Sequence, residues 1–220
     1  MSAFDLYNKP AYDLFKKTCD YVTKHNSVII ECGGHDGTDT LKLKEEFKIP
    51  VYSIEANKDL YNKFLVNIHD PDVHVYNFGL SDIDGEKTFF IDTDPRGNAG
   101  ASSFLKADFL RLPHLSHIEI PIVVPVKTLN TFISENNIEN VHLLWLDVEQ
   151  HEYEILSACS DETLSKIKYI YVETNCQEFR VGGKLVKDII NFMENKNFKL
   201  IGDLPQGGVD WQINLLFSNQ

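Results

Sequence analysis

Short apolar runs alternate with amphipathic stretches along most of the chain. Val28, Ile29 and Ile30 form one such run, which is typical of a buried strand. Residues 58–68 carry Leu, Phe and Ile at helical spacing, which indicates a helix with one apolar face. Strands and helices that alternate in this way predict an α/β fold, with a mostly parallel sheet covered by helices on both faces.

The pattern as a whole predicts a single domain over residues 1–220, with residues 1–27 as a helical N-terminal segment. The last apolar stretch, 211–217, alternates with a period of two and is expected to be an antiparallel strand. The strands are expected at residues 28–30, 51–55, 73–78, 87–91, 118–126, 141–147, 167–173, 198–201 and 211–217. The helices are expected from 38 or 39 onward and at 58–68, 128–136, 149–157 and 183–194.

The third strand is followed by an insertion, residues 79–126. Asp84 and Gly85 form a turn pair that predicts a β-hairpin. Pro121 and Pro125 indicate that the strand carrying them lies at a sheet edge. Residues 92–118 have no regular pattern, and irregular segments of this length are more often functional in compact domains. The insertion is therefore interpreted as a lid over the substrate, with a plain surface loop as the alternative.

The charge balance argues against a nucleic-acid partner. Lysine and arginine total 21 against 33 acids, a net charge of −12, and such a surface repels a phosphate backbone. No stretch approaches the roughly 20 apolar residues of a membrane span, and the first residues lack a signal-peptide pattern. The four cysteines are widely spaced, which favours reduced thiols over a disulfide or zinc site. We expect a cytoplasmic protein without membrane insertion.

The turn after the first strand indicates an adenosine cofactor. Residues 31–37 read Glu-Cys-Gly-Gly-His-Asp-Gly and lie between a buried strand and a helix, where glycine lets the backbone turn tightly and approach a ligand. Glu55 ends the next strand, at the position where an acid accepts ribose hydroxyls. The alternative is an ordinary turn followed by a surface glutamate.

The acids of this turn distinguish between adenosine cofactors. Glu31 and Asp36 would repel a pyrophosphate but attract the ammonium and sulfonium groups of S-adenosylmethionine. The glycine spacing also differs from the dinucleotide pattern, which brings a helix N-terminus against a pyrophosphate. The electrostatics therefore favour the methyl donor, S-adenosylmethionine, over NAD.

Five segments together resemble the FkbM family of class I, Rossmann-like methyltransferases. They occur in the family's order from about residue 28 to residue 217. They read VIIECGGHDGTDTL, VYSIEAN, FGLSDIDGEKTFF, VKTLNTFI and LLWLDVEQHEYEIL, the last similar to the family signature lKiDvEGaEyevL. The resemblance implies a seven-stranded Rossmann-like sheet. It also implies methyl transfer, usually to oxygen and often to a sugar hydroxyl of a glycan or glycosylated metabolite.

The resemblance also implies a donor site. The amino-acid end of the donor would lie among Glu31, Gly33 and Gly37, with His35 in the same turn and Thr38 beside it. The remaining donor contacts would come from three later strand ends. They are Glu55 at the ribose, with Ala56, Asn57, Gly79, Leu80 and Ser81 around the adenine, and Asp147 at the reacting end.

This chain departs from the family signature at three positions. Trp145 replaces the usual lysine, and Gln150 and His151 replace the usual glycine and alanine. The lost lysine motivates an alternative function, a catalytically inactive methyltransferase-like module that binds a glycan or a partner. A third possibility, an NAD-dependent oxidoreductase, is disfavoured by the acidic turn.

Candidate catalytic residues follow the strand that ends near residue 147. An alcohol is too weak an acid to react unaided near neutral pH, so a base or a metal must take or polarise its proton. Asp147, Glu149 and His151 are the candidates. Their alternative roles are an N-cap for Asp147, a first-turn acid for Glu149 and a solvent-facing helix residue for His151.

Three further questions remain open at this stage. Asp147 and Glu149 together are a weak signal for a divalent cation. Glu173 ends a strand at the same edge, as a site residue or as a structural acid. His114 and His117 are alternative bases within the predicted lid.

Overall fold

The computed structural model describes residues 26–93, 100–108, 119–205 and 211–220. Its main sheet has seven strands in the order β3-β2-β1-β7-β8-β10-β9. β10 alone runs opposite to the other six strands, so the mostly parallel sheet with an antiparallel last strand is confirmed. The strands are β1 (Ser27–Cys32), β2 (Val51–Ile54), β3 (Val73–Tyr76), β7 (Asn140–Leu146), β8 (Ile167–Asn175), β9 (Phe198–Pro205) and β10 (Gln212–Asn219).

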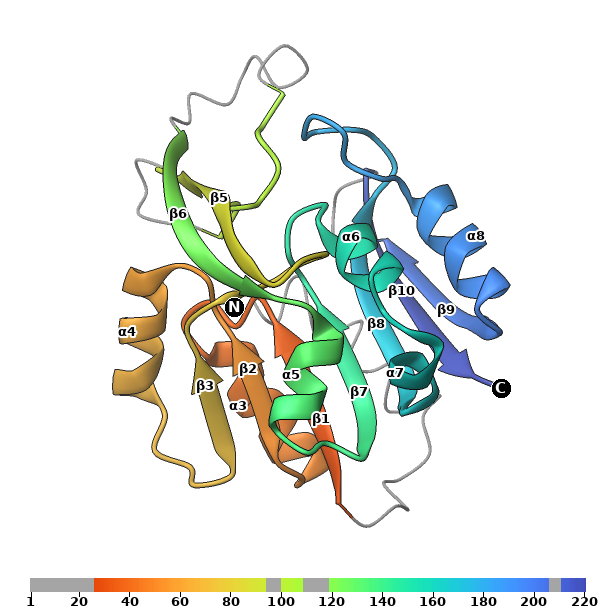
Figure 1. The fold of residues 1–220 in the computed structure, drawn as a ribbon, viewed down its shortest axis with the longest axis horizontal. Coiled ribbons are helices and arrows are strands. Elements are labelled where there is room, and N and C mark those ends of the chain that lie inside the picture. The colour runs from red at the N-terminus through yellow and green to blue at the C-terminus, as the bar shows by residue number, and fades with distance from the viewer. Residues whose placement is uncertain (1–25, 94–99, 109–118, 206–210) are drawn as a thin grey trace.

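Helices cover both faces of this sheet (Figure 1). On one face, Ile30, Leu144 and Ile170 join a core with buried residues of α5 (Leu129–Glu135), α6 (Glu152–Ser157), α7 (Asp161–Ser165) and α8 (Val186–Asn195). On the other face, Leu143 and Tyr169 pack with Leu43 of α3 (Thr38–Phe47). The apolar face expected at residues 58–68 is seen in α4 (Lys58–Asn67), which buries Leu60 and Phe64. Helix α7 is a five-residue helix that the apolar pattern did not predict.

The insertion forms a second, three-stranded sheet with the order β4-β6-β5. It consists of β4 (Gly79–Leu80), β5 (Gly85–Asp92) and β6 (Glu119–Lys127). The hairpin predicted at Asp84 and Gly85 is wrong in detail, because this turn joins β4 to β5 across β6, and the antiparallel pair is β5 with β6. Strand β6 is also central in the strand order rather than at an edge. Because β4 pairs only with Val126 and Lys127, however, the strand around Pro121 and Pro125 has β5 on one side alone.

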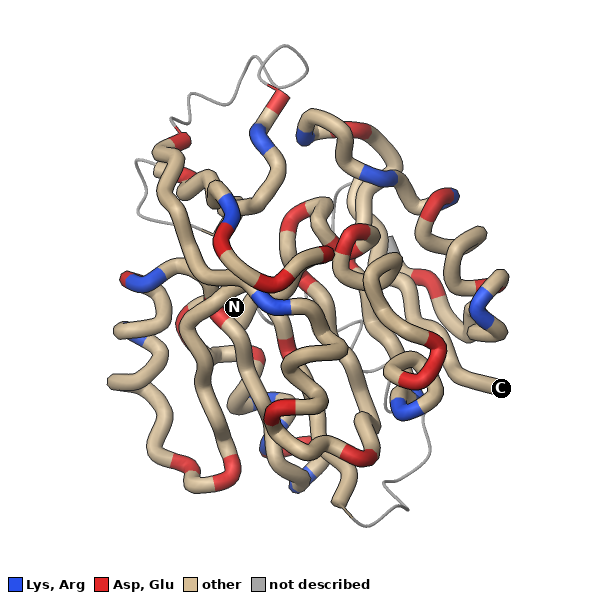
Figure 2. Tube along the Cα trace, in the orientation of Figure 1, with Lys and Arg blue, Asp and Glu red and all other residues tan. Residues whose placement is uncertain are grey.

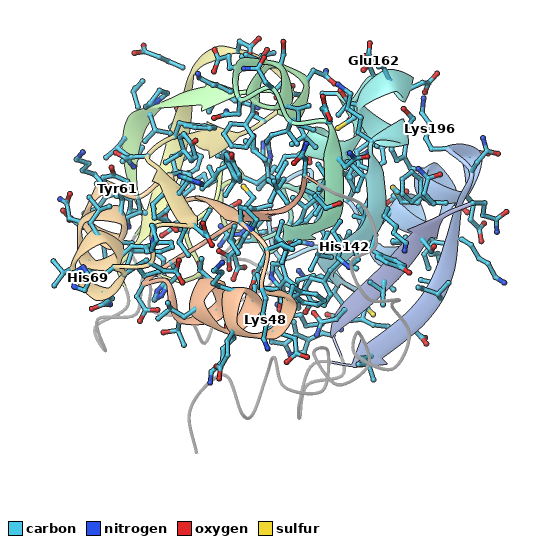
Figure 3. All side chains as sticks on the ribbon, turned by 90° about the horizontal axis from the view of Figure 1, so that it is seen from below. Lys48, Tyr61, His69, His142, Glu162 and Lys196 are labelled. Carbon is cyan, nitrogen blue, oxygen red and sulfur yellow. The ribbon has the colours of Figure 1, made fainter. Side chains whose placement is uncertain are left out.

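The second sheet stands beside the carboxyl ends of the main strands (Figure 1). Acidic residues are frequent along this border, where few basic ones lie (Figure 2). Viewed from below, side chains fill both sides of the sheet (Figure 3). His142 lies within this interior, whereas Lys48, Tyr61, His69, Glu162 and Lys196 lie towards the periphery (Figure 3). The ligand-binding edge expected for such a sheet is therefore the border with the insertion.

Several sequence predictions concern the ends of the chain and its cysteines. Ser27 already belongs to β1, and the rest of the predicted N-terminal helical segment lies almost entirely outside the described residues. Cys32 and Cys159 are buried and free, Cys176 is exposed and free, and Cys19 lies outside the described ranges. Across the described part of the chain, no helix combines the length and apolar character needed to cross a membrane.

Candidate functional site

The turn between β1 and α3 needs glycine because the protein itself fills the space beside its backbone. Gly33 has φ +95°, and a Cβ there would lie 1.9 Å from the carbonyl oxygen of Asp147. A Cβ on Gly34 would overlap Ser53 and Phe64, and one on Gly37 would overlap Phe64. The prediction explained these glycines by the approach of a ligand, whereas close packing of the turn on β7 and α4 already requires them.

The carboxyl group of Glu31 is held inside this turn rather than on its surface. It is 1% exposed, and its Oε2 accepts hydrogen bonds from the hydroxyls of Ser53, at 2.6 Å, and Thr40. Burial raises the pKa of Glu31 to about 7, against the opposing effect of those two hydroxyls. Thr40 and Ser53 were not predicted as site residues, because a hydroxyl near a turn has no distinctive pattern in the sequence.

Glu55 joins the end of β2 to the same turn. Its Oε2 accepts the backbone N–H of His35 at 2.8 Å, and its Oε1 accepts that of Asn57 at 2.6 Å. Asn57 in turn caps α4 through the N–H of Asp59. Burial raises the pKa of Glu55 to about 7. Each carboxylate oxygen thus retains a second lone pair, and we call residues 31–37 with 53–57 the glycine-rich corner.

Asp36 and His35 form the outer side of the glycine-rich corner. The carboxylate of Asp36 lies 3.7 Å from His35 Nδ1 and accepts both the N–H and the hydroxyl of Thr38, the first residue of α3. The contact with His35 holds the pKa of the Asp36 carboxyl well below its usual range. The same contact raises the pKa of His35. The turn therefore carries an ionised acid next to a histidine that favours its charged form.

The residues predicted around the adenine lie where the two sheets meet. Gly79 has no room for a side chain, since a Cβ would lie 2.3 Å from the ring of Phe104, and Ala56 lies beside both. Leu80 and Ser81 are fully buried. Phe104 was not predicted, because its position in an irregular segment gave no signal.

His151 lies beside Ser81 and Phe104. Its Nε2 lies 3.0 Å from the hydroxyl of Ser81, and its ring lies 4.9 Å from that of Phe104. The expectation of a solvent-facing residue is wrong, because His151 is 0% exposed. Burial lowers the pKa of His151 to about 3, so the ring is neutral. A role for His151 as the catalytic base stays a prediction.

The turn after β7 differs from the predicted helix start. Helix α6 begins at Glu152 with His151 at its N-cap, so Asp147 is no cap and Glu149 is no first-turn acid. Glu149 and Gln150 have φ +57° and +70°, in the left-handed region that favours glycine. The backbone therefore turns at Glu149 and Gln150, before the helix begins.

The side chain of Gln150 makes three hydrogen bonds at this strained turn. It accepts the N–H groups of Phe179 and Arg180 at 3.0 and 2.9 Å and donates to the carbonyl of Gln177. A glycine, usual here in the family that the sequence resembles, would relieve the backbone but make none of these bonds. Gln150 thus fixes residues 177–180 against the turn.

Arg180 is another buried residue near the turn that the sequence did not indicate. Its side chain is 7% exposed, donates to the carbonyls of Ala101 and Leu105 and to Glu119, and lies 3.8 Å from Glu149. Burial raises the pKa of Glu149 to about 7, and the arginine partly opposes that shift. Three segments far apart in sequence are joined by this one guanidinium.

The described part of the predicted lid, residues 100–108, is bound on two sides. Ser103 exchanges backbone hydrogen bonds with Phe90, and its hydroxyl donates to the carbonyl of Glu149. The N–H of Asp108 donates to Phe179 and that of Val181 to Lys106, which places this segment beside residues 179–181. Residues 94–99 and 109–118, with His114 and His117, lie outside the described ranges.

Asp147 lies between the glycine-rich corner and the end of β8. Its N–H donates to the carbonyl of Cys32 at 3.1 Å, and its carboxyl group is in hydrogen-bonding contact with that of Glu173. Burial raises the pKa of Glu173 well above its usual value, and the neighbouring charge of Asp147 adds to the shift. We call residues 147–150 with 173–180 the β7–β8 edge.

The position of the missing family lysine faces the α3 side of the sheet. Trp145 is 2% exposed, stacks on Tyr171 with ring centroids 3.6 Å apart, and is the register neighbour of Glu31. The indole is therefore a packed core group.

The sequence also carries a weak signal for a divalent cation at Asp147 and Glu149. Within the described ranges, no group of three or more His, Cys, Asp and Glu side chains is arranged to hold a metal ion, so these two acids have no third such ligand there.

The chain is similar to known methyltransferases in sequence and in fold. Residues 31–200 match the family model described as the Methyltransferase FkbM domain. The chain is 27% identical over 194 residues to the 2-O-methyltransferase NoeI of Sinorhizobium fredii, covering 84% of this chain and 77% of that protein. Its fold is similar to that of M. capricolum TrmK bound to S-adenosyl-homocysteine, with a TM-score of 0.53 and 11% identity over 98% of this chain and 70% of that one. It is also similar to magnesium protoporphyrin IX methyltransferase of Synechocystis bound to S-adenosylmethionine, with a TM-score of 0.52 and 9% identity over 97% and 77% of the two chains.

Proposed function

The chain belongs to the FkbM family of methyltransferases, and we propose that it transfers a methyl group to a hydroxyl of a sugar, glycan or glycosylated small molecule. It is an S-adenosylmethionine-dependent methyltransferase, which sets aside the oxidoreductase alternative. The name of the relative from Sinorhizobium fredii, a 2-O-methyltransferase, supports an oxygen acceptor.

The glycine-rich corner has the chemistry that S-adenosylmethionine requires. The donor, when bound, supplies an electrophilic methyl group on a sulfonium and leaves as a neutral thioether. Glu55 would accept the ribose hydroxyls, since each of its oxygens uses only one lone pair on the backbone. Glu31 directs its two hydrogen bonds through Oε2, which leaves Oε1 for the donor's ammonium. The buried acids would also attract the positive charges of the donor.

The position of the Asp147 carboxyl group is the observation that best supports a hydroxyl acceptor. Its backbone packs on Gly33 of the glycine-rich corner, and its carboxyl group reaches the β7–β8 edge. A carboxylate at this border can take the proton that the hydroxyl loses as its oxygen is methylated. Glu149, held near Arg180, is a second carboxyl group on the same turn. Asp147 is accordingly proposed as the base, with Glu149 beside the acceptor.

Incubation with S-adenosylmethionine and a panel of methyl glycosides and glycans, read by mass, tests this proposal. We expect a gain of one methyl group on at least one acceptor, and Asp147→Asn to lower kcat/KM by about 10²–10⁴-fold. Titration with S-adenosylhomocysteine should show that donor-site affinity survives the substitution. Asp161→Asn, at a side chain 86% exposed, is the control and should leave the rate unchanged.

Two results would contradict the proposal. Full activity of Asp147→Asn would remove its role as the base. Donor binding without transfer to any acceptor would favour an inactive binding module, the function that Trp145 in the place of the family lysine suggests.

A further inference from the structure

Strand β8 carries two buried polar side chains at its carboxyl end that the fold does not satisfy. Glu173 is 6% exposed and Asn175 4% exposed. Glu173 Oε1 and Asn175 Oδ1 are closed to solvent, and neither has a hydrogen-bond partner within the described part of the chain. Burying such acceptors unpaired costs free energy, and native proteins rarely bear that cost without a reason.

The two side chains lie on one face of β8, beside the proposed base. Residues two apart on a strand point to the same side of the sheet. Trp145 of β7 pairs with Tyr171 of β8, so Asp147 follows this register to lie next to Glu173, and their carboxyl groups are in contact. Asn214 of β10 pairs with Glu173 on the opposite side. The unsatisfied atoms are therefore near the residue assigned to the reacting hydroxyl.

The protonation of the Asp147–Glu173 pair determines which hydrogen-bond donors and acceptors a ligand meets there. Two carboxyl groups in contact bind one proton between them, because both cannot carry a charge at this distance. Burial and the neighbouring charge of Asp147 raise the pKa of Glu173, which favours the protonated form of Glu173. Glu173 then donates to Asp147 and presents Oε1 as a neutral acceptor, alongside the amide oxygen of Asn175.

We propose that Glu173 and Asn175 form an acceptor subsite that binds hydroxyl groups of the sugar next to the one methylated at Asp147. Two hydrogen-bond acceptors require a ligand with two hydrogen-bond donors. Neighbouring hydroxyl groups of a sugar ring are such donors. A doubly ionised phosphate ester, whose oxygens are all acceptors, does not fit the site. The inference rests on the proposed function, and it assigns the recognition of the acceptor to β8.

Binding of methyl glucoside, methyl mannoside and methyl galactoside to the protein loaded with S-adenosylhomocysteine tests the subsite apart from catalysis. By titration, we expect Glu173→Leu and Asn175→Ala each to weaken binding by about tenfold or more. Glu173→Gln should retain the affinity within about threefold, because an amide keeps the acceptor oxygen and still donates to Asp147. Glu152→Gln is the matched control, since Glu152 is equally buried but already accepts the N–H of Val148.

The outcomes separate this inference from the proposed function. Thermal denaturation should show that Glu173→Leu remains folded, because a leucine of similar size replaces an unsatisfied carboxyl. If the wild type binds a glycoside but never methylates one, the proposed function fails and the subsite stands. If the wild type methylates a glycoside and the Leu and Ala variants keep its KM, the subsite is wrong and the function stands. No binding of any glycoside by the wild type overturns both.

Discussion

The glycine-rich corner and the β7–β8 edge meet at Gly33 and Asp147 but are built in opposite ways. In the corner, the buried acids Glu31 and Glu55 are bonded by groups at most 22 positions away in sequence. At the edge, Arg180 reaches groups 61 to 79 positions away, and Glu173 keeps an oxygen without a partner in the described chain. Under the proposed function, the corner would be preorganised for the donor, whereas the edge would leave hydrogen bonds to be made by the acceptor.

Gly33→Ala is expected to have the largest effect, because it disrupts the contact between the two regions. The added Cβ would lie 1.9 Å from the carbonyl oxygen of Asp147, and neither backbone can give way without moving β1 or β7. Overpacking combined with a positive φ should cost on the order of 4 kcal/mol of unfolding free energy. Urea denaturation measures the loss.

Gly182→Ala is the matched control for that substitution. Gly182 has φ +82°, close to that of Gly33, but an added Cβ meets nothing within 4 Å. Only the backbone strain applies there, about 1 kcal/mol. Equal losses in the two variants would show that strain, rather than the contact with Asp147, determines the requirement for glycine at Gly33.

Arg180→Met should destabilise the β7–β8 edge without changing the structure of the glycine-rich corner. The substitution leaves Glu119 buried without its cation and removes the bonds to Ala101 and Leu105, a loss of about 3 kcal/mol. Urea denaturation should show the lower stability, and hydrogen exchange should be faster at residues 100–108. Titration should show unchanged affinity for S-adenosylhomocysteine.

Lys196→Met is the control for the loss of a cation. Lys196 pairs with Asp161 at the periphery (Figure 3), and exposed pairs of this kind contribute less than about 1 kcal/mol. If Arg180→Met weakened donor affinity as strongly as it destabilised the fold, the two regions would be coupled, and their division into separate sites would be wrong.

The difference between local contacts in the glycine-rich corner and long-range contacts at the β7–β8 edge explains which features the sequence could predict. The order of the main strands and helices follows from apolar periodicity, and the glycine-rich corner from a motif within about 25 residues of chain, so both were accessible. Arg180 and Phe104 lie in irregular segments, and their roles depend on contacts across distant parts of the chain. In the turn after β7, the sequence predicted a helix from residue 149 and missed the left-handed backbone of Glu149 and Gln150, because a helix start was the simpler interpretation.

Glu55→Gln tests whether the corner is as specific for its ligand as its hydrogen bonds indicate. Alanine would also release the N–H groups of His35 and Asn57, so glutamine, which keeps one acceptor oxygen, is the sharper change. At pH 8, above the pKa of about 7, we expect donor affinity to fall by about 10–100-fold, because one ribose hydroxyl loses a charged acceptor. Titration with S-adenosylhomocysteine measures this, and unchanged affinity would place the ribose elsewhere.

Glu152→Gln is expected to have an effect that is seen only as a dependence of stability on pH. Burial raises the pKa of Glu152 from 4.5 to about 8, so the folded state binds a proton that the unfolded state has lost. The stability from this group is fully present below pH 4.5 and is progressively lost as the pH rises towards 8. The variant lacks that loss, so its advantage over the wild type should grow between pH 5 and pH 8 in urea denaturation. Glu162→Gln, at a side chain 81% exposed, should keep the wild-type slope. Parallel curves for Glu152→Gln and the wild type would show that the Glu152 side chain is solvated rather than buried.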